Sequence, residues 1–254
     1  MEAVNARHVP SPRLVRRLAR RRLRPAEVAF LERHQDALSG DVLEIGCCGG
    51  ELTDRLIRAA RSVTGLHRSR RVIEQCTGRH PGGVFLHGEL ADVEIFPDGQ
   101  FDAVVACGEA IDLVGDDERR RLLDRVHRVL VPGGTLIFSS HNLGSESLVP
   151  PPARNWSTNP LKLAVRLARL PDALRHRAHL GRLQEREYDY GILNRHDHDY
   201  RLLHYHVTRD GQERQLAQHC FRLLECVTLD GAPVEPGDLA YGSHRLYYAA
   251  EAAW

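Results

Sequence analysis

A glycine-rich turn joins an apolar run to an amphipathic stretch near the start of the chain. Residues 41–53 read DVLEIGCCGGELT, in which the apolar run predicts a buried strand and the stretch from Glu51 predicts a helix. Gly46, Gly49 and Gly50 let the backbone turn tightly and let a ligand approach it closely. The free amides at the start of the helix can bind a carboxylate. The turn therefore predicts a cofactor site, although dinucleotide-binding folds carry a similar turn.

Two polar side chains follow later apolar runs. His141 comes directly after TLIFSS at 135–140, and Glu109 lies just beyond FDAVVAC at 101–107. Ligands of an open α/β sheet bind at the carboxyl ends of its strands. Histidine suits proton removal near neutral pH. We take His141 as the first candidate general base and Glu109 as the second, with a purely structural loop role left open for His141.

The segment 188–207 is dense in histidine, aspartate and tyrosine. Its spacings include nothing as diagnostic of a metal as His-Glu-x-x-His, so we expect no metal site. Aromatic side chains with polar tips suit the wall of a ligand pocket. We expect Tyr200, His204 and Tyr205 to contact the substrate.

The elements that must position these residues alternate between strand and helix. Apolar runs predict strands at 41–46, 62–67, 83–88, 101–107 and 135–140, and amphipathic stretches predict helices at 51–60, 70–79 and 117–130. This alternation predicts a parallel sheet covered on both faces. Residues 131–134 (VPGG) predict a tight turn before the fifth strand, and two late strands are expected at 221–229 and 245–252.

The alternation stops between the fifth strand and the late strands. Residues 143–208 contain no clear parallel-strand unit, and 161–183 predicts a helix interrupted near Pro171. The N-terminal part predicts two helices, the second over 25–38 with Pro25 in its first turn. We therefore expect three parts: an N-terminal helical cap (1–40), a core (41–142 and 209–254), and an inserted lid or pocket segment (143–208).

The motifs occur in the order and spacing of a known family. They are Glu44-Ile45-Gly46, the strand end VTGL at 63–66, Gly88-Glu89, Phe101-Asp102 and the turn VPGG at 131–134. Over 38–141, and more loosely over 209–254, the chain resembles the class I S-adenosylmethionine-dependent methyltransferases. The resemblance implies an α/β fold with a doubly wound, seven-stranded, mostly parallel Rossmann-like sheet, N-terminal helices and a helical insertion after the fifth strand.

The resemblance also implies S-adenosylmethionine as the cofactor. Glu44, Gly46 and Gly50 would line its methionine moiety, and the end of the second strand would face its ribose. The full set of expected cofactor-binding residues is Glu44, Gly46, Cys47, Gly50, His67, Arg68, Glu89, Leu90 and Cys107. Within it, Glu89 and Leu90 would lie by the adenine, and Cys107 would close the floor of the cofactor site.

Two residues depart from the family pattern. Cys48 stands where a glycine is usual, and His67 stands where the family has an acid that holds both ribose hydroxyls. A neutral histidine has one acceptor nitrogen, so ribose recognition would be weaker, water-mediated or rebuilt from elsewhere. His67-Arg68 also resembles the way NADP enzymes hold a 2′-phosphate. The chain lacks both GxGxxG and a Tyr-x-x-x-Lys pair, which counts against a reductase.

Composition limits the choice of partners. Net charge is +1, hydrophobic residues make up 42% and charged residues 27%, as in ordinary globular proteins. No apolar run reaches the length of a membrane span, the six cysteines form no CxxC pair, and a cytoplasmic protein is expected. We expect no nucleic-acid or membrane partner and leave the oligomeric state open, a homodimer included.

The leading hypothesis is an O- or N-methyltransferase for a small metabolite or short peptide, with specialised biosynthesis as its suggested setting. A methyltransferase-fold protein without methyl transfer is an alternative from another class. RNA or protein methylation through the arginine-rich segment 13–24 is a further alternative, which predicts steeply salt-dependent RNA binding.

Overall fold

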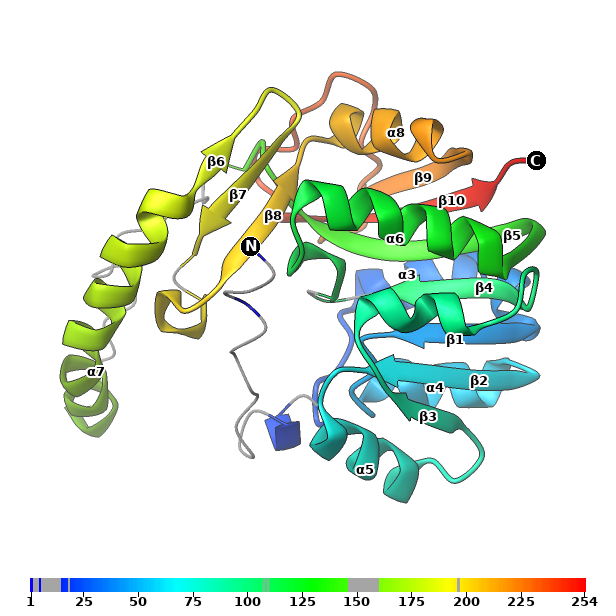
Figure 1. Cartoon of the computed structure of the whole chain (residues 1–254), viewed down its shortest axis with the longest axis horizontal. Helices are drawn as coiled ribbons and strands as arrows, with labels where there is room; N and C mark the ends of the chain where they lie inside the picture. Colours follow the sequence, from blue (N-terminus) through cyan, green and yellow to red (C-terminus); the bar gives the residue numbers. More distant parts are fainter. Residues whose placement is uncertain are drawn as a thin grey trace.

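A computed structural model of the chain describes residues 1, 5, 15–17, 19–106, 108, 110–145, 160–195 and 197–254 (Figure 1). In that part of the chain, no helix combines the length and the apolar character needed to cross a membrane.

Five parallel strands form the centre of the sheet in the order β3-β2-β1-β4-β5. They are β1 (Asp41–Ile45), β2 (Ser62–His67), β3 (Val84–His87), β4 (Phe101–Ala106) and β5 (Leu130–Asn142). β10 (Arg245–Ala252) pairs antiparallel with β5, and β9 (Phe221–Thr228) pairs antiparallel with β10. The expected mostly parallel, Rossmann-like α/β sheet is confirmed, but in the described part of the chain it has ten strands rather than seven, because three strands of the insertion join it beside β5.

Helices cover both faces of this sheet (Figure 1). The helices α3 (Pro25–Arg33) and α4 (Glu51–Ala59) pack on the face formed by Val42, Val105 and Ile137. The helices α6 (Asp116–Val129) and α8 (Arg209–Gln218) pack on the opposite face, to which Leu43 and Val104 belong. Because successive strand residues point to opposite faces, each central strand must be apolar on both sides. α5 (Arg70–Arg79) packs beside β3.

Two boundaries differ from expectation at the edges of this core. α3 begins at Pro25 as expected but ends at Arg33, and the short helix η1 (Ala37–Ser39) follows it. The residues 131–134 form a bulge inside β5 rather than a separate turn: Phe101 pairs with Leu130 and Ala103 with Thr135, so four residues lie opposite Asp102. The positive φ of Gly133, 75°, permits this detour.

The insertion contains strands that the sequence did not indicate. It consists of α7 (Pro160–Leu180), η5 (Gly181–Leu183), β6 (Glu185–Arg186), β7 (Tyr190–Asn194), η6 (Asp197–Tyr200) and β8 (Leu203–Val207). β8 pairs parallel with the end of β5, and β7 pairs antiparallel with β8. The expectation of no parallel strand in 143–208 was therefore wrong. Buried histidines in β8 replace the apolar residues by which such a strand is usually found.

The expected interruption near Pro171 is also absent. α7 runs through Pro171 without a break. Proline removes one backbone hydrogen bond from a helix, but the flanking alanine, leucine and arginine residues are strong helix formers. Figure 1 shows α7 lying apart from the main sheet, joined to it through β6, β7 and β8.

Candidate functional site

Glu44 is a buried acid near the carboxyl end of β1. Its side chain is 2% exposed, and Oε1 accepts a hydrogen bond of 3.0 Å from Thr53 Oγ1 on α4. Oε2 is buried and has no hydrogen-bond partner among the described residues. Burial raises the pKa of this carboxyl to about 7. A buried oxygen without a partner is costly, so the site suits a ligand with a cationic donor such as an ammonium group.

Gly46 follows β1 and meets the loop beyond β4. Its φ is +76°, and a Cβ at this position would lie 2.6 Å from the Cβ of Ala110. Its amide donates to the carbonyl of Leu66 over 2.8 Å, which ties the turn to the end of β2. Gly50 is the N-cap of α4 and has an extended backbone. The turn thus brings bare backbone to the edge where Glu44 lies.

The two cysteines of the turn differ in exposure. Cys47 is fully buried and packs with Cys76 of α5, whereas Cys48 is partly exposed. Burial, followed by the nearby Glu44 carboxylate, raises the pKa of the Cys48 thiol to about 12. A protonated thiol is a poor nucleophile, so the turn has no reactive cysteine at neutral pH.

His67 ends β2 with a fixed tautomer. The backbone amide of Ser69 donates to its Nδ1 over 2.9 Å, so the proton of the neutral ring is on Nε2. Burial and the charge of Arg68 lower the pKa of His67 to about 4, which keeps the ring neutral. Arg68 itself donates from Nη1 to the carbonyl of Asn5 over 3.1 Å.

The remaining residues expected at the adenine end have structural partners. Glu89 caps the short helix η2 (Leu90–Ile95) in a reciprocal pair with Asp92, and Leu90 packs against the core. Cys107 and the candidate base Glu109 lie outside the described residues. Gly108, between them, has a φ of +88° and donates from its amide to Ser139 Oγ over 3.0 Å.

His141 is held in a buried hydrogen-bond network at the end of β5. Its Nδ1 lies 2.7 Å from Asp112 Oδ2, and Arg245 Nη2 donates to its Nε2 over 3.0 Å. A neutral ring with its proton on Nδ1 satisfies both contacts. The ring is 1% exposed, and burial, with the charge of Arg245 second, lowers its pKa to about 4. His141 is therefore neutral, oriented by an acid, and covered at Nε2 by a guanidinium.

Arg119 of α6 organises the network from the other side. Its guanidinium donates to Asp112, to the carbonyl of Ile111 and to Ser140 Oγ. It also donates to Gln212 over 2.6 Å and to Gln215 over 3.0 Å on α8. Sequence reasoning missed this arginine. The available signal was its spacing, because Arg119 precedes Leu122, Leu123 and Val126 on the apolar face of the helix.

The three expected substrate-contacting residues do not share one surface. His204 and Tyr205 are consecutive on β8 and therefore point to opposite faces. The His204 ring lies 5.1 Å from that of His141, measured between centroids. Tyr205 donates to Asp116 Oδ1 over 2.6 Å, and Arg119 lies over its ring. Tyr200 is buried near Arg177.

Described residues of the N-terminal segment lie along the same carboxyl edge. The side chain of Asn5 donates to the carbonyls of Leu113 and Leu203 over 2.7 and 2.8 Å, and accepts from the Leu203 amide. Val15 packs with Cys47 and residues of α5. The amide of Glu51, the first of α4, donates to the carbonyl of Arg21 over 3.3 Å. The N-terminal segment therefore occupies part of the start of α4, where the sequence predicts free backbone amides.

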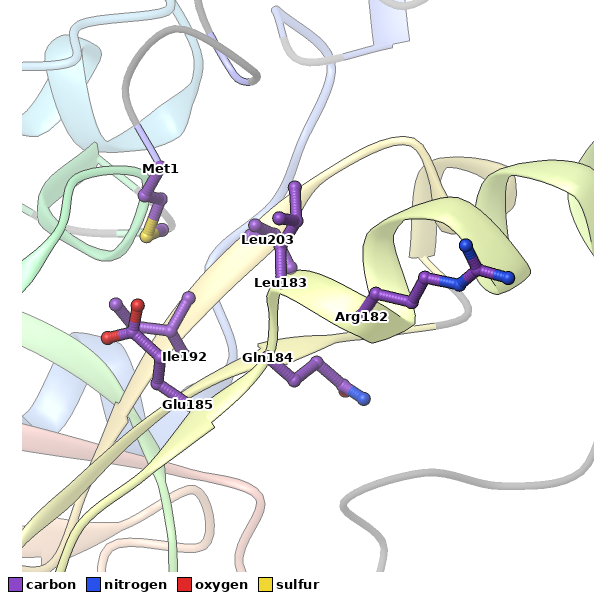
Figure 2. A pocket seen from close by; sticks show the side chains of 7 residues that line it. All are labelled: Met1, Arg182, Leu183, Gln184, Glu185, Ile192 and Leu203. Atoms are coloured by element: carbon purple, nitrogen blue, oxygen red, sulfur yellow. The ribbon is translucent and has the colours of Figure 1, made fainter.

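A cavity of about 240 Å³ opens on the insertion (Figure 2). It is lined by Met1, Arg182, Leu183, Gln184, Glu185, Ile192 and Leu203. None of these residues belongs to the glycine turn or to the His141 network. Among the residues that the structure describes, histidine, cysteine and acidic side chains form no group of three or more able to hold a metal ion.

Comparisons with known proteins agree with this geometry. Residues 42–134 match the methyltransferase domain family. A ubiquinone biosynthesis O-methyltransferase from Erwinia tasmaniensis is 32% identical over 132 residues, which cover 50% of this chain and 53% of that protein. The chain thus spans about half the length of the curated relatives it matches.

Solved structures share the fold. A 1,6-didemethyltoxoflavin-N1-methyltransferase from Burkholderia thailandensis, with 1,6-didemethyltoxoflavin and S-adenosylhomocysteine bound, has a TM-score of 0.58 at 16% identity, covering 91% of this chain and 78% of that one. An S-adenosylmethionine-dependent methyltransferase from Clostridium acetobutylicum has a TM-score of 0.59 at 13% identity, covering 90% of both chains. Residues 42–134 are thus similar to the methyltransferase domain family, and the chain shares the fold of solved S-adenosylmethionine-dependent methyltransferases.

Proposed function

We propose that this chain is an O- or N-methyltransferase that uses S-adenosylmethionine and acts on a small molecule or short peptide. The observation that carries the proposal is Oε2 of Glu44, a buried oxygen with no described partner at the edge of a glycine turn. The ammonium of the cofactor's methionine part is the kind of donor that this oxygen needs. Gly46, which leaves no room for a side chain, lets the backbone come close to the ligand.

The bound cofactor would supply a methyl group already activated on a sulfonium. The protein's task is then to place the acceptor and to take its proton. We propose that His141 takes that proton at Nε2 while Asp112 holds Nδ1–H. Because Arg245 donates to Nε2, it must turn away before His141 can act. Glu109 remains a second candidate base.

We further propose that residues 143–208 form the acceptor wall, with residues 1–40 as a cap. Pairing of β8 with the end of β5 supports this, because it sets His204 and His206 beside His141. The neighbours' names include an O-methyltransferase and an N1-methyltransferase, so the acceptor atom is proposed as oxygen or nitrogen. A biosynthetic role is part of the same proposal.

Two measurements test the proposal. Calorimetry should show binding of both S-adenosylmethionine and S-adenosylhomocysteine, and Glu44→Gln should weaken it, whereas Glu74→Gln, an exposed acid on α5, should not. Transfer of a labelled methyl group should then be measured over a panel of phenols, hydroxy acids, amines and nitrogen heterocycles. A wild-type protein that binds neither cofactor form would refute the proposal.

A second candidate is a methyltransferase-fold protein that binds its ligand without transferring a methyl group. The contact of Arg245 with Nε2 of His141 favours it, because this contact covers the lone pair that a base would use. Labelled product from any acceptor in the panel would exclude this candidate.

A further inference from the structure

His67 stands where a binding site for a ribose needs an acceptor, but it presents a donor. In doubly wound folds an acid at the end of the second strand accepts hydrogen bonds from ribose hydroxyls. Here the only acceptor nitrogen of the neutral ring, Nδ1, is already used by the Ser69 amide at 2.9 Å. The nitrogen that remains, Nε2, carries the proton and can only donate.

The surroundings keep this donor in place. The amides of Gly46 and Cys47 both donate to the carbonyl of Leu66, the residue before His67, over 2.8 and 3.3 Å. These contacts fix the end of β2 against the glycine turn. The charged or titratable groups that act on His67 are Arg68 and His87, neither of which is an acid. The position therefore favours an oxygen that accepts.

We propose that His67 determines cofactor specificity by donating from Nε2 to a ribose oxygen, so that the site requires an oxygen there but not a hydroxyl proton. This inference rests on the proposed function. An acid at the same position needs the hydroxyl proton, whereas an N–H donor can form its hydrogen bond equally well with an ether oxygen. The site should thus tolerate a ribose whose hydroxyl is methylated and reject one from which the oxygen is missing.

The experiment is calorimetry with five probes: S-adenosylhomocysteine and its 2′-deoxy, 3′-deoxy, 2′-O-methyl and 3′-O-methyl forms. For the wild type, one deoxy form should bind about three- to tenfold more weakly, the loss expected for one neutral hydrogen bond. The O-methyl form at the same position should bind within about threefold of S-adenosylhomocysteine, on the same scale. His67→Asp should reverse this order and bind the O-methyl form worst.

His67→Gln provides the matched control, because its amide nitrogen can occupy the place of Nε2 and donate. It should keep the wild-type order, whereas His67→Ala should bind the deoxy and parent ligands equally. Nitrogen-15 spectra of the ligand-free protein should show His67 protonated at Nε2. Wild-type binding of S-adenosylhomocysteine with no dependence on residue 67 would overturn this inference alone. No wild-type binding would overturn the proposed function and this inference together.

Discussion

His141 donates a hydrogen bond from Nδ1 to Oδ2 of Asp112 over 2.7 Å, and Oδ1 of the same carboxylate accepts one from Arg119 Nη1 over 3.1 Å. Burial opposes ionisation of Asp112, but its contacts with His141 and the charge of Arg119 hold its pKa well below the usual range. The buried carboxylate of Asp112 thus orients the imidazole and neutralises the charge of Arg119. The guanidinium of Arg119 also donates to two glutamines of α8. The candidate base and the packing of α6 against α8 depend on the same anion.

Replacing Asp112 by asparagine should destabilise the fold strongly. The change leaves the guanidinium of Arg119 buried without its anion, and breaking a buried pair in this way costs about 3–5 kcal/mol. Chemical denaturation should show this loss in the free energy of unfolding. Asp117→Asn, at an exposed position of α6, the helix that carries Arg119, should cost far less. Equal losses in the two variants would contradict the role assigned to Asp112.

The buried histidines should make the protein sensitive to acid. The pKa values of His67 and His141 are lowered to about 4, so the unfolded chain binds protons near pH 6.5 while the folded chain does not. Their stabilising contribution is therefore present above pH 6.5 and is lost as pH falls towards 4. For His141 this loss amounts to about 3 kcal/mol. Urea denaturation between pH 4 and 8 should show it, and His141→Asn should flatten the curve.

The contribution of Glu44 to stability should depend on pH in the opposite direction from that of the histidines. Its pKa is raised to about 7, so its contribution to stability is complete below about pH 4.5 and is lost as pH rises through 7. Glu44→Gln should therefore gain stability relative to the wild type as pH rises from 5 to 8, by up to about 3 kcal/mol. S-adenosylhomocysteine should reverse the wild-type loss, since its ammonium favours the ionised carboxylate. A difference between the two proteins that stays constant with pH would contradict a buried, titrating Glu44.

How much the sequence predicts depends on whether a local pattern or a distant contact decides the structure. The central strands and the glycine turn follow from local periodicity, and Gly46 lies where its spacing requires. The strand β8 was missed because its inward positions hold His204 and His206, which become compatible with burial only beside His141 and Arg195. Asp112 was missed because nothing in its neighbourhood indicates that it meets residues of β5 and α6.

The contact of Asn5 should hold the N-terminal segment on the carboxyl edge. Its three side-chain hydrogen bonds join the segment to the carbonyls of Leu113 and Leu203 and to the Leu203 amide. Asn5→Ala leaves those buried groups without partners, at a cost of about 1–3 kcal/mol for each that water cannot reach. Limited trypsin digestion should then cut the arginine-rich segment 13–24 faster than in the wild type. Unchanged digestion rates would show that other contacts hold the segment.

Removing Arg245 should release the lone pair of His141. The guanidinium donates to Nε2 over 3.0 Å, and its charge is the second cause, after burial, that lowers the pKa of the ring. In Arg245→Leu the pKa of His141 should rise, because the cation that opposed protonation is gone while Asp112 still accepts from Nδ1. Nitrogen-15 spectra recorded between pH 4 and 8 measure this directly. Arg222→Leu, an exposed arginine on β9, is the control and should leave His141 unchanged. If His141 has the same pKa in the wild type and in Arg245→Leu, Arg245 does not control the protonation of this base. Displacement of Arg245 by the acceptor would then not be required for His141 to act.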